Sequence, residues 1–213
     1  MADRKRKEKP EIAIIGAGRL GTALAVALAA RNYSIRALVA RRSASARKSA
    51  TLVGKAAPSS AGDVAALAAK QLGSLPPADL FLISVPDDQI ANVAAKLNQL
   101  EFDRKPVALH TSGALSSDVL SPLRAKGWST GSIHPLISVS DPTASIEGAF
   151  WSVEGDAKAV RVAKTLVRDL NGDSFSIRTA DKPLYHAAAV MTSGHVTALF
   201  DVALEMLVEC GLT

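Results

Sequence analysis

The chain has 213 residues, which is near the upper end for one domain and also long enough for one domain and part of a second. Hydrophobic residues make up 48% and charged residues 21%, an ordinary composition for a soluble protein with a sizeable core. Its single cysteine, Cys210, excludes an internal disulfide and favours a reducing, cytoplasmic setting, and no cysteine–histidine spacing predicts a metal site. The net charge is +5, but aromatic residues make up only 4% of the chain and no recognition-helix motif is present, so we do not expect nucleic acid as a partner.

The N-terminus, residues 1–10 with the sequence MADRKRKEKP, is basic and runs directly into an apolar strand pattern. It lacks the apolar segment and cleavage site of a secretory signal, so we expect a disordered basic tail. No uninterrupted apolar stretch approaches the roughly 18–20 residues that a membrane-spanning helix needs. We therefore expect no membrane partner.

Short apolar runs alternate with helical patterns along most of the chain. The expected strands cover residues 12–18, 33–40, 78–86, 105–113, 128–136, 150–155 and 174–179, and the expected helices cover 20–32, 89–100, 116–127 and 156–172. Asp87 and Asp88 are expected to cap the second of these helices, and Gly172 to close the last. Residues 49–76 hold a short strand and a helix whose boundaries the pattern does not fix.

This alternation indicates right-handed crossover connections and a mostly parallel, doubly wound sheet, so the fold class is α/β. We expect one sheet domain over residues 11–179. The pattern becomes helical from Asp181 onward, and residues 180–213 are expected to begin an all-helical C-terminal domain. Such a segment buries little by itself, so it packs on the sheet, starts a longer helical domain, or is covered by another subunit.

A glycine-rich stretch, GAGRLG, follows the first expected strand and opens the first expected helix. Gly16 permits a tight turn, Gly18 lets the backbone approach a pyrophosphate, and Gly21 lets the helix pack close to the strand. Free N–H groups at the helix start then meet the phosphates. The sequence therefore predicts a Rossmann-type dinucleotide domain, with a ligand-free turn as the alternative. The predicted contact residues are Gly16, Ala17, Gly18, Arg19, Leu20 and Gly21.

The residues after the second strand favour NADP over NAD. NAD enzymes usually carry an acid there for the ribose 2′-hydroxyl, whereas this strand ends at Ala40 and continues with Arg41, Arg42 and Ser43. Two guanidinium groups and a hydroxyl can bind a 2′-phosphate through charge-assisted hydrogen bonds. The alternatives are a solvated surface pair, or a basic patch that serves an acidic partner.

Polar residues gather where later strands end. Ser84, Val85 and Pro86 are predicted to border the nicotinamide ribose, because open parallel sheets bind ligands at the carboxyl ends of their strands. By the same rule His110 and His134 face the cofactor as candidate catalytic groups, although a strand-end histidine is more often structural. Thr111 and Ser112 are predicted substrate contacts.

The terminal helix adds a further set of candidates. At 100° per residue, Lys182, His186 and Ser193 share one stripe, while His195 lies about half a turn away. We expect Lys182 and His186 to be catalytic and Ser193 to contact substrate. The alternative is that Lys182 starts the helix in solvent. Gly194 weakens the helix and marks a kink or a close approach.

Four strings, GAGRLGTALA, SVPDDQI, HTSGALSSDVLSPLRAKGWSTGSIHPL and YHAAAVMTSGHVTAL, resemble the Rossmann-like family described as NADP oxidoreductase, deazaflavin-dependent-like, with a C-terminal domain of unknown function. The family is similar in layout to pyrroline-carboxylate reductase and the hydroxyacid dehydrogenases. The resemblance implies a helical domain that dimerises, hence a homo-oligomer through the C-terminal helices, and family members continue past residue 213. Lys182 loosely resembles a lysine of the hydroxyacid group, while His186 departs from their pattern.

The expected function is that of an NADP-dependent oxidoreductase, which moves a hydride between the nicotinamide and a small carbonyl, imine or hydroxyl substrate. The alternative is a sensor or scaffold that binds NADP(H) without turnover. The substrate, the direction of the reaction and the use of a deazaflavin are not given by the sequence.

Overall fold

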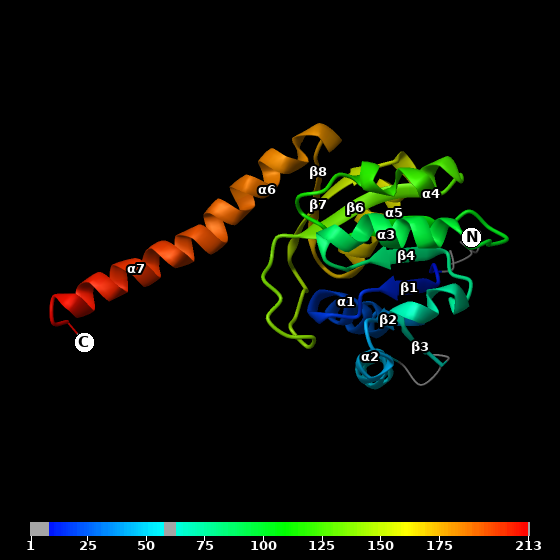
Figure 1. The fold of residues 1–213 in the computed structure, drawn as a ribbon, viewed down its shortest axis with the longest axis horizontal. Coiled ribbons are helices and arrows are strands. Elements are labelled where there is room, and N and C mark those ends of the chain that lie inside the picture. The colour runs from blue at the N-terminus through cyan, green and yellow to red at the C-terminus, as the bar shows by residue number, and fades with distance from the viewer. Residues whose placement is uncertain (1–8, 58–62, 213) are drawn as a thin grey trace, which may run out of the picture.

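The computed structural model describes residues 9–57 and 63–212, and its core is one eight-stranded sheet (Figure 1). The strand order is β3-β2-β1-β4-β5-β6-β7-β8, and the pairs from β3 to β6 are parallel. β7 runs antiparallel to β6, and β8 runs parallel to β7. The strands are β1 (Ile12–Ile15), β2 (Ile35–Ala40), β3 (Ala65–Ala68), β4 (Leu80–Ile83), β5 (Val107–His110), β6 (Ser129–Pro135), β7 (Phe150–Gly155) and β8 (Asp173–Ser176).

Helices cover both faces of the sheet, because its buried strands alternate apolar side chains to either side. One face packs against α1 (Arg19–Ala30), α2 (Ser43–Ala56) and α5 (Ala157–Asp169), and the other against α3 (Asp87–Asn98) and α4 (Ser121–Ala125). Within β1, Ile12 and Ile14 face the first group while Ala13 and Ile15 face the second. The predicted fold class, a doubly wound and mostly parallel α/β sheet, is confirmed. The 3₁₀ segments are Ala69–Ser74, Ser117–Leu120 and Thr179–Asp181.

Local details correct the sequence predictions at two helix ends. Asp87 and Asp88 are not caps: Pro86 is the N-cap of α3, both acids lie in its first turn, and the Asp87 carboxylate accepts a hydrogen bond from Ser112. Asn171, at φ 56°, takes the left-handed position after α5 that the sequence assigned to Gly172. Asparagine tolerates this conformation because its short polar side chain bonds locally.

The ambiguous stretch 49–76 contains the end of α2, the edge strand β3 and a 3₁₀ turn. Of the predicted basic tail, residues 1–8 lie outside the described residues. Lys9 is held at the sheet domain, where its Nζ donates to the carbonyl of Arg31 at 2.7 Å and pairs with Asp169 at 3.3 Å.

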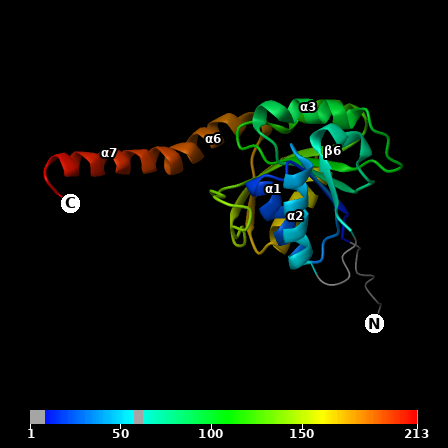
Figure 2. The same cartoon turned by 60° about the horizontal axis from the view of Figure 1, so that its bottom comes forward.

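The C-terminal helix projects away from the sheet domain in both views (Figures 1 and 2). It comprises α6 (Lys182–Val190), a π-helical turn at Met191–His195 and α7 (Val196–Glu209). The π-turn contains Gly194 and agrees with the predicted irregularity there. The continuous helix Thr179–Glu209 is 31 residues long with a mean hydropathy of 1.4 in its most apolar window, none of which is buried. By length and composition alone, this helix is able to span a membrane.

Candidate active site

The glycine turn has the geometry of a phosphate cradle. Gly16 adopts φ 106°, and a Cβ there would overlap the carbonyl group of Ser84, so only glycine fits. A Cβ on Gly18 would meet nothing within 4 Å, and no side chain caps the helix that begins at Arg19. Open space in front of an uncapped helix N-terminus suits an anionic diphosphate. The residues present therefore fit a dinucleotide.

The basic residues Arg41 and Arg42 follow the end of β2, which is hydrogen-bonded to this turn. The carbonyl of Val39 accepts hydrogen bonds from the N–H groups of Gly16 and Ala17, both at 2.8 Å, so the end of β2 is fastened to the bend. Arg41 and Arg42 follow Val39 closely and are exposed. Neither forms an ion pair with the described residues. Ser43 is the first residue of α2. Arg41 and Arg42 thus follow directly on the strand end that is hydrogen-bonded to the glycine turn.

The ends of β4 and β5 are joined by polar contacts. The Thr111 hydroxyl donates to Ser84 Oγ at 3.3 Å, and Ser84 N donates to the carbonyl of Ile15 at 2.7 Å. Ser112 is nearly buried, and its hydroxyl donates to Asp87 at 2.8 Å while accepting from the backbone of the following loop. These contacts shape the loop after β5. Val85 is partly exposed and Pro86 exposed on the neighbouring strand end.

Lys182 is completely buried, so the alternative that it starts the helix in solvent is wrong. Its Nζ donates to the carbonyl of Ser112 at 2.7 Å and to the hydroxyl of Ser132 in β6. Burial lowers the pKa of the ammonium to about 8, against the opposing pull of the Glu154 and Asp87 carboxylates. Lys182 therefore ties the terminal helix to the ends of β5 and β6.

His110 is also fully enclosed. Its Nδ1 accepts from the backbone N–H of Ser112 at 3.2 Å, and burial followed by the charge on Lys182 lowers its pKa to about 3. The imidazole is therefore neutral near pH 7. As placed, His110 supports the loop rather than meeting solvent.

Two other histidines converge over the same loop. A Cβ on Gly113 would lie 2.5 Å from Nδ1 of His186 and 2.7 Å from Nε2 of His134, so both rings pack directly on the glycine. The rings are 5.9 Å apart and nearly perpendicular. Burial, then the charges on Lys182 and His186, lower the pKa of His134 to about 4. Tyr185 completes the group, with its hydroxyl 3.0 Å from Nδ1 of His134.

Sequence reasoning missed Gly113 and Tyr185. Tyr185 directly precedes His186 and lies three residues after Lys182, so its place on the inner side of α6 was available from the helical period. The structure brings together Lys182, His134 and His186. Ser193 lies apart on the exposed π-turn, where its hydroxyl donates to the carbonyl of Ala189 at 2.7 Å.

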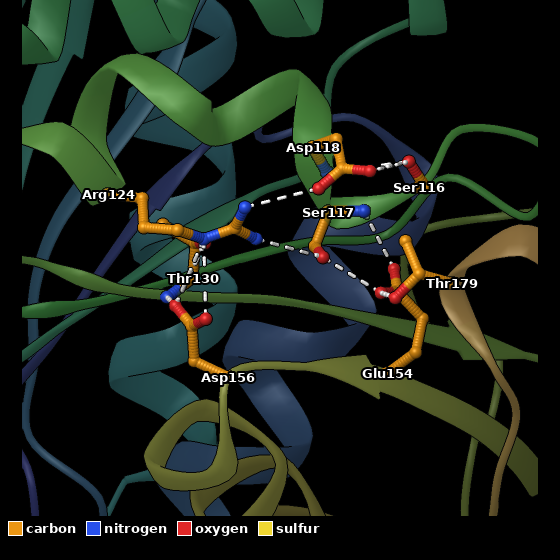
Figure 3. Close-up of polar contacts among 8 residues, drawn as sticks. All are labelled: Ser116, Ser117, Asp118, Arg124, Thr130, Glu154, Asp156 and Thr179. Carbon is orange, nitrogen blue, oxygen red and sulfur yellow. Dashed lines mark hydrogen bonds and ion pairs between the residues drawn. The ribbon is translucent and has the colours of Figure 1, made fainter.

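A polar network holds the terminal helix in this position (Figure 3). The buried carboxylate of Glu154 in β7 accepts from the backbone N–H of Ser117 at 2.7 Å, from the Ser117 hydroxyl at 2.8 Å and from the Thr179 hydroxyl at 3.0 Å. Arg124 stands beside it and pairs with Asp118 at 3.1 Å and Asp156 at 3.3 Å. The network joins β7 to the segment after the histidine loop and to the start of the helix that carries Lys182.

A family model described as a Rossmann-like domain matches residues 2–135, more than half of the chain. The chain belongs to the Rossmann-like domain family. A second model, described as a domain of unknown function (DUF2520), matches residues 149–213. In this Rossmann-like protein the second region comprises β7, α5, β8 and the terminal helix. The resemblance drawn from the sequence is thereby confirmed.

Three solved structures are similar to this Rossmann-like protein. Protein TM1727 of Thermotoga maritima is 26% identical with a TM-score of 0.72, over 95% of this chain and 71% of that one. A candidate NADP oxidoreductase of Bacteroides fragilis is 21% identical with a TM-score of 0.75, over 96% and 74%. A pyrroline-5-carboxylate reductase of Coxiella burnetii is 14% identical with a TM-score of 0.69, over 97% and 73%. No curated protein sequence matches the chain.

Proposed function

We propose that this Rossmann-like protein is an NADP-dependent oxidoreductase that transfers a hydride between the nicotinamide and a small carbonyl, imine or hydroxyl substrate. The proposal rests on the position of the glycine turn and of two histidines at the same edge of the sheet. The phosphate cradle at Gly16–Gly18 follows β1, and His134 lies near the carboxyl end of β6, at the same edge of the sheet. His186 of α6 reaches this edge because its ring packs with that of His134 on Gly113, in the loop after β5. This edge is where parallel sheets bind dinucleotides.

Each part of the site has a separate task. The glycine turn and the start of α1 bind the diphosphate, while Arg41, Arg42 and Ser43 bind the 2′-phosphate. Residues 84–86 border the ribose and hold the ring at the edge of the sheet. The cofactor, when bound, supplies or accepts the hydride. His134 and His186 then orient the reacting oxygen or nitrogen of the substrate and move its proton.

The preference for NADP is tested by titrating the full chain with NADPH and NADH. We expect Arg41→Ala and Arg42→Ala each to weaken NADPH binding by roughly 1–3 kcal/mol, about 5- to 150-fold in Kd, and to leave NADH binding unchanged. Arg161→Ala is the matched control, because Arg161 is an exposed arginine on α5. If a chain that carries both Arg41→Ala and Arg42→Ala binds NADPH as well as the unaltered chain, the two arginines serve another partner.

Turnover distinguishes an enzyme from a sensor. We expect the absorbance of NADPH at its reduced-nicotinamide band to fall when one member of a panel of ketones and imines is added, and we include a deazaflavin as an alternative acceptor. Tight NADPH binding without turnover of any member favours the sensor or scaffold.

We further propose a cytoplasmic homo-oligomer in which a second copy covers α7. The most exposed large apolar side chains of α7 are Leu199, Phe200, Val202, Leu204, Met206, Leu207 and Val208, each at least 46% exposed. Light scattering after gel filtration should give a dimer or larger assembly, and Phe200→Glu should weaken it. A monomer that floats with phosphatidylcholine vesicles would instead assign the helix to a membrane.

A further inference from the structure

The hydroxyl of Tyr185 lies 3.0 Å from Nδ1 of His134, and this contact determines which nitrogen of the imidazole carries the proton. A phenol is a stronger hydrogen-bond donor than a neutral imidazole N–H, and an imidazole nitrogen is a stronger acceptor than a phenol oxygen. The favoured arrangement therefore has Tyr185 donating to Nδ1. The proton of the neutral ring is then on Nε2.

Burial and neighbouring charges keep the imidazole of His134 neutral. The titratable and charged groups that face it are Lys182, Tyr185 and His186 on the helix and His110 on β5. The ammonium of Lys182 and the burial of the ring both disfavour a second positive charge. The phenol stays protonated as well, because burial raises the pKa of Tyr185.

Nε2 of His134 lies near a buried nitrogen that has no hydrogen-bond partner among the described residues. It packs against Gly113 beside Nδ1 of His186, and that second nitrogen is buried without a hydrogen-bond partner among the described residues. A buried imidazole nitrogen without a partner is costly, so a group that bonds it is expected in the working protein. The Nε2–H of His134 and the unpaired Nδ1 of His186 thus both lie against Gly113, at the edge of the sheet where the carboxyl ends of β1, β5 and β6 lie.

We propose that Tyr185 is a positioning residue that holds His134 as the Nε2–H tautomer, so that His134 acts as a neutral hydrogen-bond donor to the oxygen or nitrogen of the reacting carbonyl or imine. The substrate part of this statement rests on the proposed function, whereas the tautomer does not. In the reducing direction the substrate carbon gains the hydride, the π electrons of its C=O or C=N bond move to the oxygen or nitrogen, and that atom takes the Nε2 proton of His134. This leaves the ring as an imidazolate whose Nδ1 still accepts the hydrogen bond from the Tyr185 hydroxyl. The ring of His134 then regains a proton on Nε2 from solvent.

The ring of Tyr185 also packs on its neighbours, 5.9 Å from both Phe175 and His134. Tyr185→Phe keeps this packing and removes only the hydroxyl. Tyr33→Phe is the matched control, because it removes a tyrosine hydroxyl that donates to Asp169 at 2.7 Å, away from the histidines.

The tautomer is measured by ¹⁵N NMR of the histidine rings in the full chain, with His134→Gln used to assign the His134 signals. We expect the Nε2–H form in the unaltered protein and in Tyr33→Phe. Tyr185→Phe should give an Nδ1–H or mixed form and a raised His134 pKa, because a bond that stabilises the neutral ring has been lost. An Nδ1–H ring in the unaltered protein, or an unchanged tautomer in Tyr185→Phe, overturns the assignment.

The kinetics of Tyr185→Phe provide the second test of the proposal. We expect Tyr185→Phe to lower kcat at least tenfold with little change in KM, since the proton transfer rather than binding is impaired. A tautomer switch with unchanged kcat overturns the role of His134 as donor. A tautomer switch in a protein that turns over no substrate refutes the proposed function and leaves the Tyr185–His134 contact standing.

Discussion

Replacing Gly113 with alanine should displace the two imidazoles that converge on it. The new Cβ would lie 2.5 Å from Nδ1 of His186 and 2.7 Å from Nε2 of His134, whereas ordinary van der Waals contact begins near 3.4 Å. Both rings must therefore move away from the new Cβ, that of His186 by about 0.9 Å and that of His134 by about 0.7 Å, unless the loop itself shifts. His134 resists because Tyr185 holds its far side. We expect a loss of about 1–3 kcal/mol in the free energy of unfolding, the usual cost of overpacking.

The consequence for catalysis should be larger than the loss of stability. A displacement of about 1 Å at a reacting group costs on the order of 100-fold in rate. Urea unfolding measures the stability, and the histidine ring signals report the displacement without any substrate. Gly54→Ala in α2 is the control: its Cβ would meet nothing, and we expect it to stabilise the chain by roughly 0.5–1 kcal/mol. A Gly113→Ala protein with unaltered stability and unaltered ring signals would refute this packing argument.

Three further predictions concern buried titratable side chains. Glu154→Gln should cost about 1–3 kcal/mol in urea unfolding, because an amide replaces a carboxylate that accepts three hydrogen bonds, whereas Glu101→Gln on the surface should cost little. His110 and His134 stay neutral in the folded state with a pKa of about 3 and about 4, so the unfolded chain takes up their protons first; stability should fall as the pH drops from about 6.5 towards 4, and a flat profile would contradict this. The lowered pKa of Lys182, about 8, means that its burial costs stability below that pH and that the cost is relieved as the pH rises towards 10.5. Lys182→Met should remove this rise, and an undiminished rise would assign it to other groups.

Local pattern was sufficient to predict the alternation of strands and helices. The apolar runs at β1, β4 and β5 are short and end in glycine, proline or polar residues, and the glycine turn lies between a strand and a helix as predicted. The left-handed residue after α5 was misplaced because asparagine and glycine both tolerate it, and the neighbouring Asn171 took the position.

The contacts that build the candidate site depend on long-range pairing, which no local period shows. Tyr185 meets His134 across 51 residues of chain, and Lys182 meets the carbonyl of Ser112 across 70. The direction of β7 and the burial of Glu154 likewise follow from how distant segments pack. The strand-end rule placed the histidines at the right edge of the sheet, but it did not distinguish the fully buried His110 from the partly exposed His134.

The Glu154 carboxylate links a sheet strand to the residue that opens the terminal helix, and both lie within the region that begins at residue 149. Anyone who builds hybrids from this protein and a distant homologue should therefore join them inside the surface loop between β6 and β7. A junction between residues 155 and 178 would instead take Glu154 and Thr179 from different parents and separate the carboxylate from its hydroxyl donor, and such a hybrid should express poorly.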